Sequence, residues 1–123
     1  MKILIVEDSK FVQNITRKLV TERFPEAEVL TATNGEDGYA LYREHAPDIV
    51  LSDLLMPGMS GQELLRAIRA DDANTKVIVI SADVQKATRD EIEAMGISGF
   101  VSKPVTGERA ELLATLIAEA ATC

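Results

Sequence analysis

The chain has 123 residues, of which 46% are hydrophobic and 27% are charged, and this length fits one compact domain. Twenty acidic residues against thirteen basic ones give a net charge of -7, which argues against nucleic acid or an anionic membrane as a partner of this chain alone. A single cysteine excludes a disulfide framework and suits a reducing cytoplasm. The apolar runs are too short for a signal peptide or a membrane span, so we expect a cytoplasmic protein.

Five short apolar runs, each followed by a longer helical pattern, indicate five βα units. The expected strands are Ile3 to Val6, Val29 to Ala32, Ile49 to Leu51, Val77 to Ile80, and Phe100 to Val101. Strands that alternate with helices predict a parallel sheet, because a parallel crossover must return along the sheet. Their almost wholly apolar composition predicts helices on both faces. The expected fold class is therefore α/β, a doubly wound five-stranded parallel sheet with five helices.

Apolar residues in the helical segments recur at positions that share one face of a helix. We expect three buried faces, formed by Phe11, Val12, Ile15 and Leu19, by Leu64, Leu65 and Ile68, and by Leu113, Leu116, Ile117 and Ala120. Asn34, Ser60 and Thr106 are placed as N-caps, and Ser60 with Glu63 has the spacing of a capping box.

Ionisable or hydroxyl side chains follow four of the five expected strands. They are Glu7 and Asp8 after the first strand, Asp53 after the third, Ser81 after the fourth, and Lys103 after the fifth. In an open parallel sheet, the carboxyl ends of the strands share the edge where ligand sites form. Each residue alone fits a helix cap or a solvated surface group, but convergence on one edge favours a functional site.

Three carboxylates within ~5 Å would repel one another by roughly 3 kcal/mol per pair at an effective dielectric of ~20. A bound Mg²⁺ would offset this repulsion, because it is commonly held by carboxylates together with a phosphate. A carboxyl group with a raised pKa is the alternative. Beside a metal, a carboxylate oxygen of Asp53 can attack a phosphoryl group and form an acyl phosphate. Lys103 and the Ser81 hydroxyl would then bind the phosphoryl oxygens.

Four segments together resemble the receiver domains of bacterial two-component response regulators, in their single-domain, CheY-like form. The segments are ILIVEDS at 3–9, DIVLSDLLMPGMSG at 48–61, VIVISAD at 77–83 and GFVSKP at 99–104. The resemblance covers essentially the whole chain and implies a flavodoxin-like fold with strand order 2-1-3-4-5. Because the last helical pattern ends about where the chain ends, we expect one receiver domain over residues 1–123 and no output domain.

The resemblance implies a role for each acid at the sheet edge. Asp53 would be the phosphoacceptor, Asp8 would bind Mg²⁺ directly, and Glu7 would hold the metal largely through water. The backbone carbonyl of Leu55 would supply a further metal ligand. The Lys103-Pro104 peptide bond is expected to be cis.

The resemblance also implies a switch built from two side chains. The Ser81 hydroxyl would turn towards the phosphoryl group, with Lys103 as the cationic partner, and Phe100 would occupy the space that Ser81 vacates. This movement would remodel the surface of the fourth helix, fifth strand and fifth helix, where a downstream protein is expected to bind.

Three positions in these motifs differ from the common family residue or allow two roles. Phe100 stands where many family members have tyrosine, so it offers no hydroxyl to a partner. Leu55 stands where many have a polar side chain that affects the hydrolytic water, so we expect slow self-dephosphorylation and dependence on a phosphatase or on back-transfer to a kinase. Asp83 is placed equally well to orient water or to cap the next helix.

The only histidine, His45, lies near the end of the second helical pattern and is interpreted as a helix-end residue. The phosphodonor histidine must then belong to another protein, a histidine kinase or a phosphotransfer protein. We therefore expect a signalling protein that catalyses only its own phosphorylation and dephosphorylation. Chemotaxis is one candidate pathway.

Four alternatives remain open. An aspartyl-nucleophile phosphohydrolase would need a second acid where Leu55 stands, and a flavodoxin-like electron carrier would need a hydroxyl-rich phosphate loop where the chain has the acidic VEDSKF. A receiver used only as an interaction module is disfavoured by the complete set of acids, hydroxyl and lysine. The chain can also be a receiver cut from a longer regulator.

Overall fold

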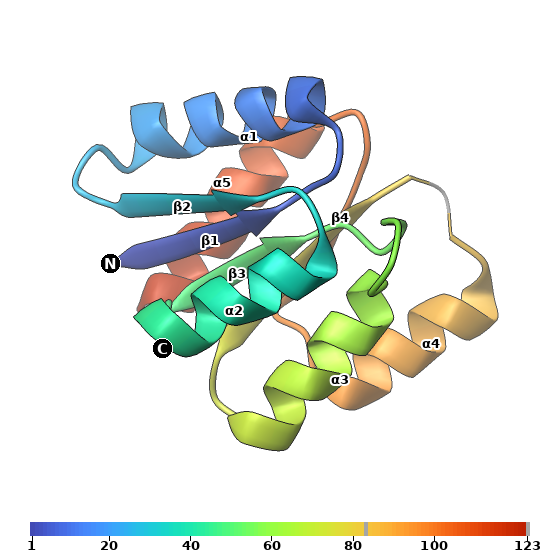
Figure 1. Ribbon diagram of the computed structural model, residues 1–123. Helices are drawn as coiled ribbons and strands as arrows, with labels where there is room; N and C mark the ends of the chain where they lie inside the picture. The colour runs from blue at the N-terminus through green and yellow to red at the C-terminus, as the bar shows by residue number, and fades with distance from the viewer. Residues whose placement is uncertain (83, 123) are drawn as a thin grey trace.

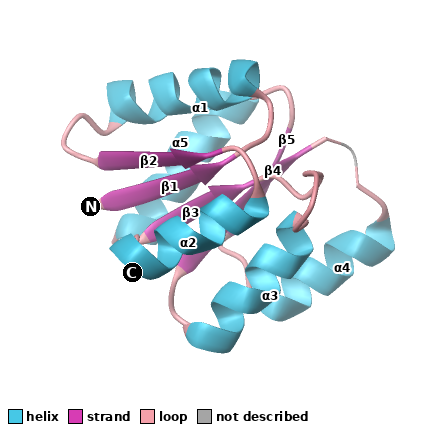
Figure 2. Cartoon of the chain, in the orientation of Figure 1, coloured by secondary structure: helices cyan, strands magenta, loops and turns pink. Residues whose placement is uncertain are grey.

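The computed structural model describes residues 1–82 and 84–122, so Asp83 and Cys123 lie outside the described residues. Strands and helices alternate along the described chain (Figures 1 and 2). In chain order they are β1 Lys2–Val6, α1 Lys10–Arg23, β2 Glu28–Ala32, α2 Gly35–His45, β3 Ile49–Ser52, α3 Gly61–Asp71, β4 Lys76–Ser81, α4 Lys86–Met95, β5 Gly99–Ser102 and α5 Glu108–Ala121. Each expected strand is present within one or two residues of its predicted bounds.

The five strands form one parallel sheet in the order β2-β1-β3-β4-β5, as the sequence predicts. The chain first winds outward from β1 to β2 and then reverses through β3, β4 and β5. The register pairs Val6 of β1 with Ala32 of β2 and with Ser52 of β3, so the carboxyl ends of these strands are level. Residues that follow β1 and β3 are therefore neighbours at one edge of the sheet.

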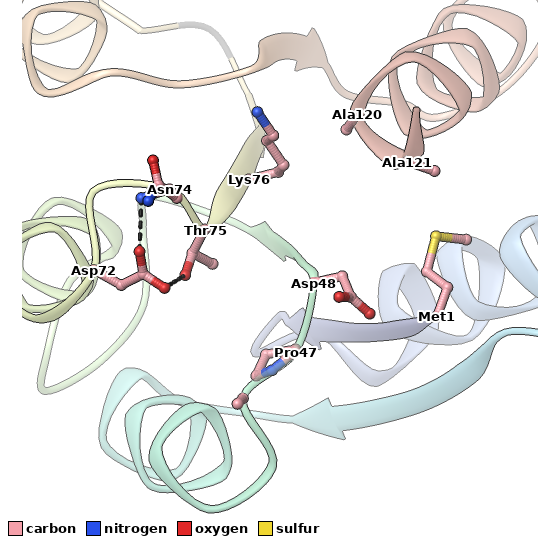
Figure 3. A pocket seen from close by; sticks show the side chains of 10 residues that line it. Met1, Pro47, Asp48, Asp72, Asn74, Thr75, Lys76, Ala120 and Ala121 are labelled. Atoms are coloured by element: carbon pink, nitrogen blue, oxygen red, sulfur yellow. Dashed lines mark hydrogen bonds between the residues drawn. The ribbon is translucent and has the colours of Figure 1, made fainter. Parts of the chain in front are cut away.

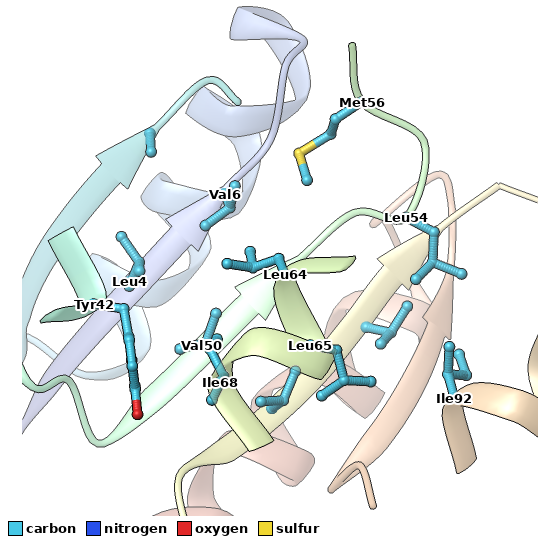
Figure 4. Close-up of a cluster of buried hydrophobic side chains, with 13 residues drawn as sticks. Leu4, Val6, Tyr42, Val50, Leu54, Met56, Leu64, Leu65, Ile68 and Ile92 are labelled. Atoms are coloured by element: carbon cyan, nitrogen blue, oxygen red, sulfur yellow. The ribbon is translucent and has the colours of Figure 1, made fainter. Parts of the chain in front are cut away.

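Helices cover both faces of the sheet, which confirms the doubly wound α/β fold (Figure 1). On one face, α2, α3 and α4 bury an apolar cluster that includes Leu4, Val50 and Ile68 (Figure 4). On the other face, α1 and α5 cover a second cluster that includes Ile5 and Ile117. The central strands are apolar on both sides because both sides are buried.

The buried face of α1 differs from the prediction. Phe11 is 75% exposed, and Val12, Ile15 and Leu19 are only partly buried. The residues that are buried are Gln13, Thr16 and Val20. A polar side chain can occupy this face because the Gln13 amide nitrogen donates to the carbonyl oxygens of Ala32 at 2.9 Å and Glu7 at 3.4 Å, which satisfies its two N–H donors. The predicted faces of α3 and α5 are confirmed, with Leu116 only partly buried.

The helix starts agree with two of the three predicted caps. The Asn34 side chain accepts the amide of Asp37, and Ser60 with Glu63 forms a complete capping box. Thr106 was expected to cap α5, and this prediction is wrong, because α5 begins one residue later with Gly107 as its N-cap. Gly107 has φ +57°, a backbone conformation that glycine adopts without steric cost, so the chain enters the helix there.

α4 is attached to the rest of the fold by few apolar contacts. Ile92 is its one fully buried side chain. Arg66 of α3 pairs with Glu91 at 2.9 Å, and the Arg69 guanidinium donates to the carbonyl oxygens of Met95 and Gly96 at 3.2 and 2.7 Å. The C-terminal end of α4 is therefore bound to α3 through its backbone.

The loop that follows β3 returns closely past its own strand. The amide of Gly61, the first residue of α3, donates to the Leu54 carbonyl at 2.9 Å. A Cβ at position 61 would lie 2.1 Å from the Asp53 carbonyl oxygen and 2.5 Å from the Leu54 Cα. Both are backbone atoms that cannot move without displacing the end of β3, so this approach requires glycine.

Replacement of Gly61 by alanine is expected to lower the free energy of unfolding by about 2–3 kcal/mol, because the added methyl group overlaps backbone at the end of β3. Urea denaturation measures the change. Ala70→Ser, on the exposed part of α3, is the control and should change the free energy by less than about 0.5 kcal/mol. Equal stability of Gly61→Ala and the wild type would contradict the close approach.

Candidate functional site

Three carboxylates meet at the carboxyl edge of the sheet. Glu7 and Asp8 follow β1, and Asp53 follows the neighbouring strand β3. One carboxylate oxygen from each lies within 4.8 Å of the others. Glu7 and Asp53 are buried, whereas Asp8 is exposed and open to solvent. An all-oxygen donor set with one solvent-facing member fits a hard divalent cation that keeps some of its waters, so these residues can hold a metal ion.

The carboxylate of Asp53 has hydrogen-bond partners on both oxygens. Its Oδ1 accepts from the Ser81 hydroxyl at 2.9 Å and from the backbone amides of Leu54 and Leu55 at 2.7 and 3.2 Å. Its Oδ2 accepts from Lys103 Nζ at 2.7 Å. These donors stabilise the charged carboxylate although it is 4% exposed. The structure thus places the Ser81 hydroxyl and the Lys103 ammonium group, both predicted from the sequence, in contact with Asp53.

Lys103 connects two of the acids. Its Nζ lies 2.8 Å from Glu7 Oε1 and 2.7 Å from Asp53 Oδ2, and its side chain is only 20% exposed. Burial alone would lower the pKa of this ammonium group, but its hydrogen bonds to Asp53 and Glu7 outweigh burial and raise the pKa. Lys103 therefore stays charged at neutral pH. The Lys103-Pro104 bond is cis, as the resemblance implies.

At Glu7, burial and hydrogen bonding act on the carboxyl pKa in opposite directions. Burial raises the pKa of its carboxyl group, and the hydrogen bonds from Lys103 and from the Ser9 amide offset only part of this effect. The negative charge of Asp53 acts in the same direction as burial. A raised carboxyl pKa and a bound cation, which the sequence leaves open as alternatives, are thus both compatible with the same cluster.

The two predicted switch residues lie on neighbouring strands. Ser81 ends β4 and is fully buried, and Phe100 of β5 is half-buried. The Arg89 guanidinium of α4 lies over the Phe100 ring, 4.4 Å from its centroid, and its Nε donates to Glu93 at 3.0 Å. This cation–π contact connects α4 to β5.

Two further predicted positions can be placed. The Leu55 side chain is 65% exposed at the rim beside Asp53, and its amide faces that acid, whereas the role of its carbonyl stays a prediction. His45 is the last residue of α2, as predicted, and α2 ends beside the beginning of β3, away from the acidic edge.

A surface hollow lies at the other edge of the sheet, where the strands begin (Figure 3). It is lined by residues from the chain start, from the turns before β3 and β4, and from the end of α5, among them Met1, Asp48, Thr75 and Ala120. The acids, the Ser81 hydroxyl and Lys103 of the carboxyl edge do not line this hollow. The hollow and the acidic cluster are therefore separate features at opposite edges of the sheet.

Three contacts near this edge were not predicted from the sequence. They involve Gln13, which bonds the ends of β1 and β2, Arg89 on Phe100, and Glu36, which accepts the Met59 amide at 3.0 Å. Gln13 interrupts an apolar pattern, which is a usable signal. Arg89 and Glu36 are exposed and stand among other charged residues of their helices, so their sequence positions carry no signal.

The sequence profile of the response regulator receiver domain matches residues 3–117. The chain belongs to this family. The receiver domain is 35% identical over 108 residues to the chemotaxis protein CheY of Thermotoga maritima, covering 88% of this chain and 89% of that protein. It is 34% identical to the probable C4-dicarboxylate response regulator DctR of Bacillus subtilis, covering 88% of this chain but only 48% of that protein.

Solved structures agree with this membership. The signal receiver domain of a DNA-binding response regulator from Colwellia psychrerythraea superposes with a TM-score of 0.90 at 28% identity, covering 100% of this chain and 99% of that one. The chemotaxis protein CheY4 of Vibrio cholerae gives a TM-score of 0.82 at 28% identity, covering 95% and 96%. Receiver domains of this kind act in two-component signalling. Among the described residues, the helices are too short and too polar to cross a bilayer.

Replacement of Lys103 by methionine is expected to lower the free energy of unfolding at pH 7 by about 3 kcal/mol, because two buried carboxylates lose their shared counter-charge. The raised pKa of Glu7 sets the sign of the pH dependence. The folded state then binds a proton that the unfolded state releases, so the variant should regain stability as pH falls from 7 to 5.

Urea titrations of Lys103→Met at both pH values, with Lys103→Met/Glu7→Gln as the matched control, measure this effect. The double variant should be more stable than the single one at pH 7 and less dependent on pH. A single variant as stable as the wild type at pH 7 would refute the counter-charge role.

Proposed function

We propose that this receiver domain is a phosphorylation-switched signalling protein that accepts a phosphoryl group on Asp53. The donor would be the phosphorylated histidine of a separate histidine kinase or phosphotransfer protein. An Asp53 oxygen would form the new bond to phosphorus as the bond to the donor nitrogen breaks. The observation that carries this proposal is the convergence of Ser81 and Lys103 on the two oxygens of a buried Asp53, at 2.9 and 2.7 Å.

Mg²⁺ is the metal we propose for the acidic cluster. Glu7, Asp8, Asp53 and the backbone carbonyl of Leu55 would hold it, with Glu7 acting largely through water. The ion would supply positive charge to the carboxylates and to the phosphoryl oxygens. The oxygen-only donor set and the proximity of the three acids support this assignment.

After transfer, the Ser81 hydroxyl and Lys103 would bind phosphoryl oxygens in place of the Asp53 carboxylate. Hydrogen bonds to charged groups contribute ~1.5–3 kcal/mol each, and shifting a population from 1:99 to 99:1 takes ~5.5 kcal/mol, so both contacts are needed. Movement of Ser81 would free space for Phe100, which is half-buried on the neighbouring strand β5, two residues before the register partner of Ser81. The Phe100 ring would then leave Arg89, and the α4–β5–α5 face would change for a downstream protein.

Membership of the receiver family does not by itself specify the signalling pathway. Relatives include chemotaxis proteins called CheY and a probable C4-dicarboxylate response regulator, so chemotaxis is one proposal among several. A phosphatase partner and a cytoplasmic location belong to the same proposal. The acidic charge supports protein partners in preference to nucleic acid, although two structural neighbours come from DNA-binding response regulators.

A second candidate is a receiver that forms part of a longer regulator. The chain spans 48% of the length of DctR and 29% of a protein-glutamate methylesterase from Bacillus licheniformis that is 35% identical over 106 residues. In either case we propose that this chain catalyses only its own phosphorylation and dephosphorylation. A phosphohydrolase is disfavoured because Leu55 occupies the place of the second acid.

Incubation with acetyl phosphate and Mg²⁺ is expected to add the mass of one phosphoryl group to the intact protein. Asp53→Ala should gain no mass, because the attacking carboxylate is gone, and Asp90→Ala, which removes an exposed aspartate of α4, should react like the wild type. Intact-protein mass spectrometry measures the result. Phosphorylation of Asp53→Ala to the wild-type extent would reject the proposed acceptor.

Leu55→Asn is expected to lose the phosphoryl group at least about tenfold faster than the wild type, because a polar side chain at this exposed rim position can hold the attacking water. Leucine cannot hydrogen-bond that water. The decay of the phosphorylated mass after removal of acetyl phosphate gives the rate, with Leu55→Met as the apolar control. Equal rates for Leu55→Asn and the wild type would reject slow dephosphorylation as a consequence of Leu55.

A further inference from the structure

Glu36, in the first turn of α2, contacts the loop that joins β3 to α3. Its Oε1 accepts a hydrogen bond from the backbone amide of Met59 at 3.0 Å. A Cβ on Gly58 would lie 2.6 Å from Glu36 Oε2, so the carboxylate rests directly against the backbone of Gly58. Gly58 has φ +73°, in the left-handed region that glycine tolerates. The loop backbone thus packs directly against this carboxylate.

The start of α2 approaches the same loop through its own backbone. A Cβ on Gly35 would lie 2.5 Å from the Met59 carbonyl oxygen, which shows that the two segments touch without an intervening side chain. A carboxylate in the first turn of a helix is common because it faces the positive end of the helix dipole. That general preference explains an acid at position 36, but it does not explain a hydrogen bond to residue 59.

Other contacts hold the loop at its two ends and through two methionine side chains, Met56 and Met59. Near β3, the amides of Leu54 and Leu55 are held by Asp53 Oδ1, and near α3 the chain is fixed by the capping box at Ser60. Between them, the Met56 side chain packs into the core and Met59 packs against it, whereas residues 57 and 58 are exposed. The Glu36 contact is therefore where α2 restrains the exposed bend of the loop.

We propose that Glu36 is a positioning residue for the metal site, which acts by fixing this loop before a metal binds. The inference rests on the proposed function, in which the carbonyl of Leu55 is a metal ligand. A ligand that is already held in place loses less freedom on binding, so its restraint strengthens binding. Groups that orient a metal ligand without touching the metal have the same effect on affinity. Glu36 would therefore support Mg²⁺ binding from outside the acidic cluster.

Three variants separate this role from the helix-start role. Glu36→Ala removes the contact, Glu36→Gln keeps an oxygen acceptor of the same reach, and Glu36→Asp keeps the charge but shortens the side chain by one methylene. Glu26→Ala, in the exposed turn between α1 and β2, controls for the change in net charge. Each is measured by isothermal titration with MgCl₂ and by amide hydrogen exchange of Leu55 and Met59 in metal-free protein.

We expect Glu36→Ala and Glu36→Asp to bind Mg²⁺ about fivefold more weakly than the wild type, which corresponds to one lost hydrogen bond. The amides of Leu55 and Met59 should exchange faster in both variants. Glu36→Gln and Glu26→Ala should stay within about twofold of the wild-type affinity.

Wild-type affinity in Glu36→Ala, or retention of affinity in Glu36→Asp with loss in Glu36→Gln, would overturn the positioning role. The second pattern would show that the charge at the helix start is what matters. If the wild type itself neither binds Mg²⁺ nor gains a phosphoryl group, the proposed function fails and this inference fails with it. If the wild type does both and Glu36→Ala binds like it, only this inference fails.

Discussion

The mutual repulsion of carboxylates at one edge of the sheet is the constraint around which the rest of the molecule is arranged. Glu7 and Asp53 are buried side by side, so their charges need compensation that solvent cannot supply. Lys103 provides it by contacting both acids at hydrogen-bond distance. The lysine comes from the end of β5, two strands away from β3, and its reach across β4 connects the edge strand to the centre of the sheet. A change in the charge of Asp53 therefore acts directly on Lys103 at the end of β5.

The topology explains why these groups can meet although they are far apart in the chain. Lys103 and Asp53 are separated by 50 positions, yet every parallel strand delivers its last residue to the same edge. The reversal of winding between β1 and β3 places their ends next to each other without a crossing helix between them. The helices then cover the faces of the sheet and leave the edge open. The same arrangement leaves Asp8 exposed while Glu7 and Asp53 are buried.

Much of this was accessible from the sequence, for identifiable physical reasons. Apolar strands covered on both sides have a strong and simple pattern, so strand positions and fold class could be predicted, and the residue after each strand could be assigned to the edge. The buried face of α1 could not be predicted, because burial of Gln13 depends on two carbonyl groups that only the folded chain brings together. The cap of α5 was misplaced because Gly107 adopts a backbone conformation that competes with the side-chain preference of Thr106. Contacts of Arg89 and Glu36 depend on tertiary placement of exposed side chains, which periodicity does not report.

The bonds that Arg69 donates to Met95 and Gly96 have a consequence for how the protein can diversify. The Arg69 guanidinium donates to peptide carbonyl groups, which any amino acid offers at position 95, and these bonds do not depend on the side chains of α4. The outward-facing residues of that helix can therefore be exchanged with little effect on how its end is anchored. A scaffold of this kind can acquire new binding specificities on α4 while its stability is supplied from α3.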